Sequence, residues 1–202
     1  MTALFIVSDI FGKTSALERL GETLGSLTNS NVDIIEPYDG KMMGFTDEQS
    51  AYHYFSDHVG LTTYTEQLQD SINACAQELI LIGFSIGTSA IWQLSQGSNN
   101  VINQRSVTNN GIIQTAIGFY GSQIRHQLEI IPTFPIELIY PKSELHFSVT
   151  DLMNKLRDKE QLTLTQVDYL HGFMNRHSTN FNQQGYQCYC DLLADKINRV
   201  NA

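Results

Sequence analysis

A short segment in the middle of the chain has the residue types and the spacing that could hold a reactive serine. Glu78 to Ile82 is the strongest β-strand candidate of the sequence, and it runs directly into Gly83-Phe84-Ser85-Ile86-Gly87. A Gly-x-Ser-x-Gly turn between a strand and a helix lifts the serine hydroxyl above the sheet, at the positive end of the helix. The pattern alone is common, so its position between this strand and a helix expected at Thr88 to Leu94 carries the argument. Ser85 is the candidate nucleophile.

Two further residues could complete the chemistry that a serine nucleophile needs. His171 directly follows the last predicted strand, so its imidazole is expected at the same edge of the sheet, where it can accept the serine proton. His177 is an alternative base in the following segment. Glu144 lies in the loop after the penultimate strand, where a carboxylate could orient the imidazole. Asp151 is the rival acid, although it is better placed to cap the next helix.

Two backbone N–H groups are expected to stabilise the oxyanion that forms when the serine attacks. One belongs to Ile86, directly after the nucleophile, and the other to Ile10, in the loop that follows the first strand. Gly12 would let this loop turn sharply. Backbone donors leave no trace in composition, so these assignments depend only on the order of the elements.

The elements that must position these residues alternate between strand and helix. Short apolar runs predict strands at 3–7, 32–35, 78–82, 112–119, 135–140 and 162–167; apolar spacing predicts helices at 15–27, 63–75, 88–94, 149–157 and 181–197. Ser15 is the expected N-cap of the first helix. This alternation predicts an α/β fold, a doubly wound and mostly parallel sheet of about six strands with helices on both faces. Residues 1–202 are expected to form a single domain, with ligands at the carboxyl ends of the strands.

In two segments the apolar residues show neither helical nor strand spacing. Residues 38–60 are rich in tyrosine, phenylalanine and histidine, and they predict a long loop or a broken helix. Aromatic side chains of this segment, Tyr52 and Phe55 among them, are expected to shape an acyl pocket. Gln96 to Asn110 is polar and rich in asparagine, which predicts a surface loop.

Composition and charge argue against several classes of partner. The net charge of -9 over 202 residues repels phosphate backbones and anionic membranes, so neither nucleic acid nor a membrane is an expected partner. The chain has no apolar stretch near the ~20 residues that span a bilayer and no signal-peptide pattern, so a cytoplasmic location is expected. The three cysteines, Cys75, Cys188 and Cys190, lack the usual zinc spacing, and the sequence implies no metal or organic cofactor. The oligomeric state is left open.

Four segments together resemble the dienelactone hydrolase family of the α/β-hydrolase superfamily. In chain order they are Ile6-Val7-Ser8-Asp9-Ile10-Phe11-Gly12, Gly83-Phe84-Ser85-Ile86-Gly87, Gly118-Phe119-Tyr120-Gly121 and His171-Gly172-Phe173. The sequence departs from the family at three positions. Ser85 replaces the usual cysteine, and Glu144 replaces the usual aspartate. Asn175 stands where dienelactone-cleaving members have an arginine, with Arg176 displaced by one residue.

The resemblance implies an α/β-hydrolase fold and a carboxylic ester hydrolase that acts on a small-molecule ester, lactone or thioester. In this interpretation Ser85, His171 and Glu144 form a catalytic triad. The substrate-binding residues are then expected to be Phe11, Tyr120 and Arg176. Two alternatives remain: an acyltransferase with the same triad, and a non-catalytic α/β-hydrolase-like binding protein.

Overall fold

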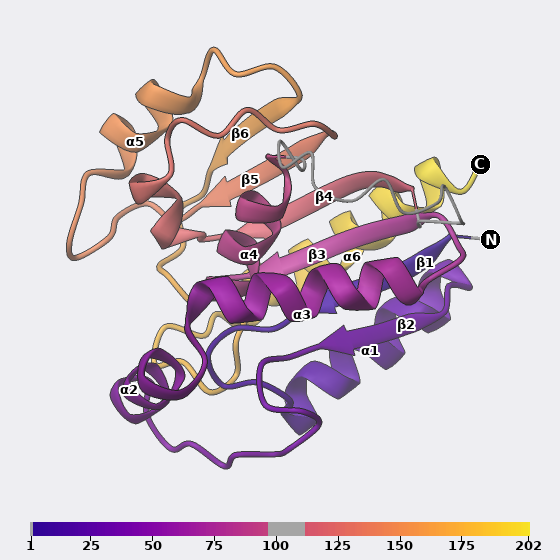
Figure 1. Ribbon diagram of the computed structural model, residues 1–202, viewed down its shortest axis with the longest axis horizontal. Coiled ribbons are helices and arrows are strands. Elements are labelled where there is room, and N and C mark those ends of the chain that lie inside the picture. The colour runs from indigo at the N-terminus through magenta and orange to yellow at the C-terminus, as the bar shows by residue number, and fades with distance from the viewer. Residues whose placement is uncertain (1, 97–111) are drawn as a thin grey trace.

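The strands of the chain form one parallel sheet, seen in the computed structural model of Figure 1. The structure describes residues 2–96 and 112–202. The surface loop predicted at 96–110 therefore lies outside the described residues, except for residue 96. Within them the sheet has six strands, in the order β2-β1-β3-β4-β5-β6. The strands are β1 (Ala3–Val7), β2 (Val32–Ile35), β3 (Leu79–Phe84), β4 (Ile113–Phe119), β5 (Ile136–Tyr140) and β6 (Leu162–Gln166). The predicted α/β architecture is confirmed.

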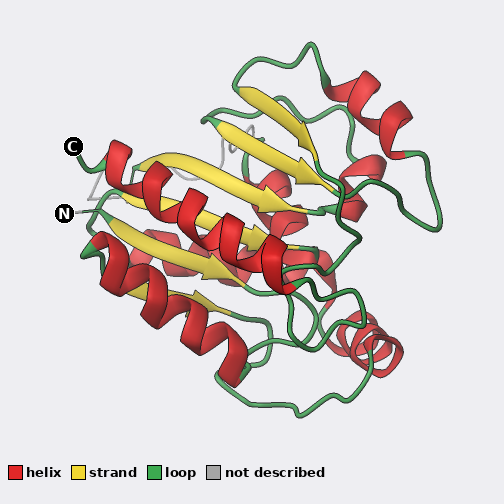
Figure 2. Ribbon diagram, turned by 180° about the vertical axis from the view of Figure 1, so that it is seen from behind, coloured by secondary structure: helices red, strands yellow, loops and turns green. Residues whose placement is uncertain are grey.

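Helices cover both faces of this sheet. One face carries α3 (Gly60–Ala74), α4 (Ile86–Leu94) and α5 (Val149–Leu156), and the other carries α1 (Ser15–Thr28) and α6 (Gln183–Val200), which lie in front in Figure 2. The side chains of β1 alternate between the two cores: Phe5 packs on the α3 side, and Leu4 and Ile6 pack on the α1 side. A strand buried on both faces must be apolar throughout, which explains the unbroken apolar runs of the central strands.

The strand order creates a switch point between β1 and β3. From β1 the chain passes through α1 to β2 on one side, and it then returns through α2 (Glu48–His58) and α3 to β3 on the other side. β1 and β3 pair in parallel, with Val7 opposite Gly83. Loops that leave two neighbouring strands in opposite directions open a crevice at their carboxyl ends. The loop that contains Ile10 and the turn that contains Ser85 both begin there.

Two helix caps differ from the sequence-based predictions. Thr14, and not Ser15, caps α1, because its hydroxyl accepts the N–H of Leu17 at 3.2 Å. Ser148, and not Asp151, caps α5, because its hydroxyl accepts the N–H of Asp151 at 3.2 Å. Both capping residues have extended backbone angles, as a residue just outside a helix must, whereas Ser15 and Asp151 are already helical.

The segment predicted as a long loop or broken helix contains the regular helix α2. The carboxylate of Asp47 caps this helix by accepting the N–H of Ser50 at 2.7 Å. Within α2, Ala51 and Phe55 are the buried residues, so its apolar stripe is too narrow to give the sequence a visible period. The chain before α2, from residue 36 to 47, is irregular as expected. In the described part of the chain, no helix is long and apolar enough to cross a bilayer.

Candidate active site

The turn between β3 and α4 holds Ser85 in a strained backbone conformation. Ser85 has φ 50° and ψ -109°, a region that residues with a side chain rarely adopt. Two hydrogen bonds fix it: the N–H of Ser85 donates to the Phe119 carbonyl at 2.9 Å, and the Ser85 carbonyl accepts from the N–H of Ser89 at 3.2 Å. The strain is thus held by β4 on one side and by the first turn of α4 on the other.

The two glycines of this turn are required by close packing of the backbone. A Cβ atom at Gly87 would lie 2.3 Å from the carbonyl oxygen of Val7, and one at Gly83 would lie 2.8 Å from the Thr88 backbone. Neither position has room for a side chain, because backbone atoms cannot move aside as a flexible side chain can. The Gly-x-Ser-x-Gly spacing therefore lets α4 begin against the end of β1, with Ser85 half-buried between them.

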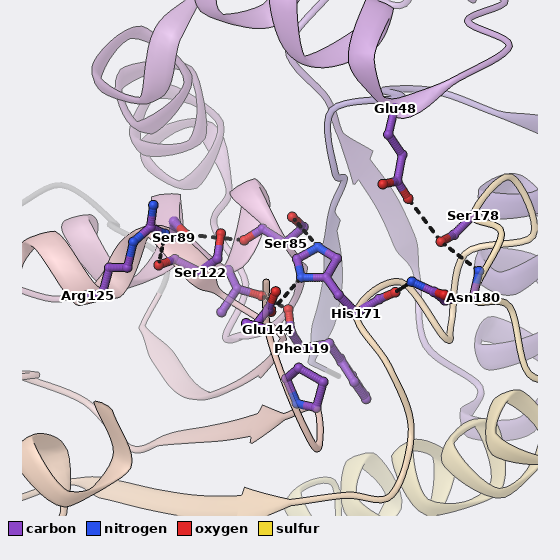
Figure 3. Close-up of polar contacts among 12 residues, drawn as sticks. Glu48, Ser85, Ser89, Phe119, Ser122, Arg125, Glu144, His171, Ser178 and Asn180 are labelled. Atoms are coloured by element: carbon purple, nitrogen blue, oxygen red, sulfur yellow. Dashed lines mark hydrogen bonds and ion pairs between the residues drawn. The ribbon is translucent and has the colours of Figure 1, made fainter. Parts of the chain in front are cut away.

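Ser85, His171 and Glu144 form a continuous chain of hydrogen bonds (Figure 3). The Ser85 Oγ lies 3.1 Å from His171 Nε2, and His171 Nδ1 lies 2.7 Å from Glu144 Oε1. Their elements are the turn after β3, the loop after β5 and the loop after β6, so the sheet brings together residues up to 86 positions apart. The His171 side chain is 28% exposed and that of Glu144 12%, which leaves the imidazole accessible from one side.

A buried aromatic ring and a series of hydrogen bonds hold His171 in place. The ring of Tyr120, which is 1% exposed, lies 4.7 Å from the imidazole ring, centroid to centroid. The side chain of Asn180 donates to the His171 carbonyl at 2.9 Å. Asn180 in turn donates its backbone N–H to the hydroxyl of Ser178 at 3.2 Å, and that hydroxyl donates to a carboxylate oxygen of Glu48 at 3.0 Å. These contacts connect α2 to the loop that carries the imidazole.

Nothing in the sequence marks Glu48, Ser178 or Asn180 as site residues. Glu48 and Ser178 are separated by 130 positions, and no local pattern links them. Asn180 follows His171 by nine residues in an irregular segment, where polar side chains are common. An alignment of related sequences is the kind of signal that could reveal such a pair.

The two expected oxyanion donors lie at the same opening as Ser85. Ile86 is the first residue of α4, so its N–H has no acceptor within the helix. Ile10 belongs to a loop that is held in place by the Tyr38 hydroxyl, which donates to the Ile10 carbonyl at 2.7 Å. Gly12 has φ 68°, which is the sharp turn expected there. Ile10, Ile86 and Ser85 all line one cavity of about 690 Å³.

This cavity, called the Ser85 cavity below, has two kinds of wall. Tyr52, Leu145 and Leu170 supply large apolar side chains. Polar groups come from Ser122, Gln123 and Arg125 of the short 3₁₀ helix after β4. The cavity therefore offers both polar and apolar contacts to a ligand beside the Ser85 hydroxyl. Across the described residues, His, Cys, Asp and Glu side chains form no group of three that could hold a metal ion.

The three residues expected to bind substrate are not in the lining of the Ser85 cavity as the described residues define it. Phe11 is 4% exposed and stacks on the imidazole of His177, with 5.7 Å between ring centroids. Tyr120 packs behind His171. The exposed Arg176 places its guanidinium 5.1 Å from the ring centres of Phe181 and Tyr186. Tyr120 and Arg176 line a separate cavity of about 20 Å³, and a substrate-binding role for the three stays a prediction.

The aromatic segment contributes to the cavity in part. Tyr52 lines it and is 50% exposed. Phe55 is 3% exposed and instead packs edge-on against Tyr64 in the core. The two residues lie three positions apart on α2 and are neighbours on its surface, with Phe55 turned into the core and Tyr52 at the exposed edge. Phe55 therefore has a packing role, and Tyr52 is the residue that could meet a ligand.

Asp9, directly after β1 and Ser8, carries a carboxyl group with an unusual environment. Burial raises its pKa from 3.8 to about 6, against the lowering effect of two donors, the Phe11 N–H at 2.9 Å and the Asn175 side chain at 2.6 Å. The hydrogen bond to Asn175 joins the loop after β1 to the loop after β6. The Asn175 amide, which the sequence resemblance places at the position of an arginine in dienelactone-cleaving enzymes, is thereby engaged by Asp9.

The raised pKa of Asp9 predicts a stability that depends on pH. Between pH 3.8 and about 6 the folded protein keeps a proton that the unfolded chain has released, so the contribution of Asp9 to stability falls as pH rises through this window. We expect a loss on the order of 2–3 kcal/mol at most between pH 4 and pH 7. The measurement is urea unfolding of the wild type and of Asp9→Asn at both pH values. The free energy of unfolding of the variant minus that of wild type should be more positive at pH 7 than at pH 4. The same difference at both pH values would contradict the prediction.

Comparison with known proteins supports the fold. No protein-family model matches the chain. The uncharacterized protein YczH of Bacillus subtilis (strain 168) is 28% identical over 186 residues, which span 89% of this chain and 84% of that protein. A thermophilic esterase from Thermogutta terrifontis, solved with propionate bound, has a TM-score of 0.66 at 10% identity over 98% of this chain and 84% of its own. A serine hydrolase homologue from Coxiella burnetii has a TM-score of 0.56 at 10% identity, and the match covers 100% of this chain and 86% of that protein. The chain has the α/β-hydrolase fold.

Proposed function

We propose that this protein is a serine hydrolase that cleaves a small-molecule ester, lactone or thioester. The observation that carries the proposal is the hydrogen-bonded chain from Ser85 through His171 to Glu144, with 3.1 Å and 2.7 Å between the bonded atoms. The fold it shares with esterases adds support, because in this fold the nucleophile lies on a turn of the same kind. The resemblance to dienelactone hydrolases supports the same class of reaction.

In the proposed mechanism each of the three side chains has one task. His171 takes the Ser85 proton at Nε2 while the Ser85 Oγ attacks the acyl carbon, and Glu144 stabilises the resulting imidazolium at Nδ1. The N–H groups of Ile10 and Ile86 stabilise the oxyanion. His171 then protonates the leaving oxygen or sulfur, which departs and leaves an acyl group on Ser85. Water, activated by the same imidazole, releases the acyl group as a carboxylic acid.

Glu144 is favoured over Asp151 as the acid of this mechanism. Its carboxylate is in contact with the imidazole, whereas Asp151 lies in the first turn of α5, where its backbone N–H bonds to Ser148. Glutamate is one methylene longer than aspartate, so its loop can lie further from His171 and still make the contact. Dienelactone itself is a poor candidate substrate, because Asn175 replaces the family's arginine and is engaged by Asp9.

Labelling with a fluorophosphonate probe tests the proposal directly. The probe forms a covalent bond with an activated serine, so wild type should be labelled in proportion to time and Ser85→Ala should not be labelled. Ser56→Ala, which changes an exposed serine of α2, is the matched control and should be labelled like wild type. Labelling that persists in Ser85→Ala would contradict the assignment of the nucleophile.

The products decide between the proposed function and its alternatives. A screen of short aryl esters, lactones and thioesters should give free acid as product. If a dissolved alcohol or amine captured most of the acyl group, the protein would be an acyltransferase, because the triad is the same in both cases. If neither labelling nor turnover occurred, a non-catalytic binding protein would be indicated.

A further inference from the structure

Three large apolar side chains stand exposed around the mouth of the Ser85 cavity. Tyr52 is 50% exposed, Leu145 94% and Leu170 39%, and all three line the cavity. They come from α2, from the loop after β5 and from the loop after β6. Single exposed apolar residues are ordinary, but three of them from separate elements around one opening are typical of a surface that contacts an apolar ligand. We call these three residues the apolar rim.

Each residue of the apolar rim is tied to the catalytic base. Leu170 directly precedes His171, and Leu145 directly follows Glu144, whose carboxylate bonds to His171. Tyr52 lies one helical turn after Glu48, which connects through Ser178 and Asn180 to the His171 carbonyl.

Figure 3 shows the layout around these residues. Glu48, Ser178 and Asn180 lie on one side of the Ser85–His171 pair, whereas Ser122 and Arg125 lie on the other side. The apolar rim is placed by its neighbours in the chain: Leu170 adjoins His171, and Leu145 adjoins Glu144. The apolar rim therefore lies around the imidazole of the base.

The chemistry of the proposed reaction decides which part of the substrate lies beside the base. His171 must deliver its proton to the leaving oxygen or sulfur, so the leaving group must lie beside Nε2. The acyl group stays bonded to Ser85 after the leaving group has departed. We propose that the apolar rim binds the leaving group, and that the substrates are esters or thioesters whose alcohol or thiol part is an apolar chain. This inference rests on the proposed hydrolase function and adds the substrate class.

A series of acetate esters tests the inference, because it changes only the leaving group. The alcohols of ethyl, butyl and hexyl acetate have nearly equal intrinsic leaving ability, so differences in kcat/KM report binding of the chain during acylation. Partial burial of each methylene on an open surface should raise kcat/KM by roughly twofold, so hexyl acetate, with four more methylenes, should exceed ethyl acetate by about 15-fold. Acetate release in a pH-stat gives the rates.

Variants of the apolar rim locate the effect. Leu145→Ala and Leu170→Ala should each lower the hexyl-to-ethyl ratio by roughly two- to fivefold. Both side chains are exposed, so both variants should melt within a degree or two of wild type. The matched control is Ile131→Ala: Ile131 is 62% exposed and precedes β5, whose carboxyl end, and not its amino end, faces the site. This control should keep the wild-type ratio.

A second series separates the leaving group from the acyl group. p-Nitrophenyl acetate, butyrate and hexanoate share one leaving group and differ in acyl length. Leu145→Ala and Leu170→Ala should leave the hexanoate-to-acetate ratio of this series as it is in wild type. The inference would be overturned if kcat/KM were the same for all alkyl acetates. It would also be overturned if the variants changed the hexanoate-to-acetate ratio but not the hexyl-to-ethyl ratio. In both cases the proposed hydrolysis itself would stand. Absence of turnover with every ester, together with absence of probe labelling, would overturn the proposed function and the inference with it.

Discussion

Replacing Ser85 by alanine should abolish hydrolysis of an activated ester, with a loss in kcat on the order of 10⁴-fold or more. The Ser85 Oγ is the atom that lies 3.1 Å from His171 Nε2, and no bond to the acyl group can form without it. Any residual rate would come from the Ile10 and Ile86 amides and from binding alone. The measurement is kcat and KM with p-nitrophenyl acetate, for the wild type and the variant.

The structure of Ser85→Ala should be close to that of wild type. Alanine has the same Cβ as serine and meets the same strain at φ 50°, so the substitution removes only the hydroxyl. The melting temperature and the near-ultraviolet circular dichroism should therefore match those of wild type, which separates loss of chemistry from loss of fold. Turnover that persists in a correctly folded Ser85→Ala would end the assignment of the nucleophile.

Glu144→Gln should cause the second large effect, a fall in kcat/KM of up to ~10⁴-fold. Glu144 Oε1 lies 2.7 Å from His171 Nδ1, and its negative charge stabilises the imidazolium that forms during attack. Glutamine keeps the size and shape of the side chain, but it is neutral and can present an amide N–H, which favours the wrong tautomer of the imidazole. The loss should be smaller if another carboxylate can reach the ring.

Asp151→Asn is the matched control for this prediction. Asp151 lies seven residues further on, in the first turn of α5, and the loss of its charge should cost under about 1 kcal/mol of stability with little effect on turnover. Both variants should be measured on one activated ester. If Asp151→Asn loses activity and Glu144→Gln keeps it, the assignment of the acid is reversed. If both keep it, His171 is oriented by another group.

The sequence was most informative where the structure depends on neighbouring residues. The strand before Ser85 and the glycines on either side of it predict the turn because the close contact of Gly87 with Val7 leaves no alternative residue. The alternation of apolar runs and helical spacing predicts the sheet for a similar reason, since a central parallel strand must be apolar on both faces. Order along the chain then suffices to bring Glu144 and His171 to one edge.

The sequence was least informative where residues far apart meet. The hydrogen bonds from Glu48 to Ser178 and from Asn180 to His171 depend on how α2 packs, and α2 itself was hidden because its apolar stripe is narrow. Arg176 shows a second reason. Its long side chain lies over the rings of Phe181 and Tyr186, away from the Ser85 cavity, and the direction of such a side chain cannot be read from its position in the sequence.

The edge position of β6 has a consequence for how the activity of this protein responds to stress. Among the described strands β6 bonds only to β5, and its residues are half-buried or exposed, whereas β3 lies between β1 and β4 and is fully buried. Local opening costs the least free energy at edge elements of this kind. The loop that carries His171 follows β6 directly, so a fluctuation at this edge would separate His171 from Ser85 while Ser85 stays in place. We therefore expect heat or mild denaturant to suppress the proposed hydrolysis reversibly before the sheet as a whole unfolds.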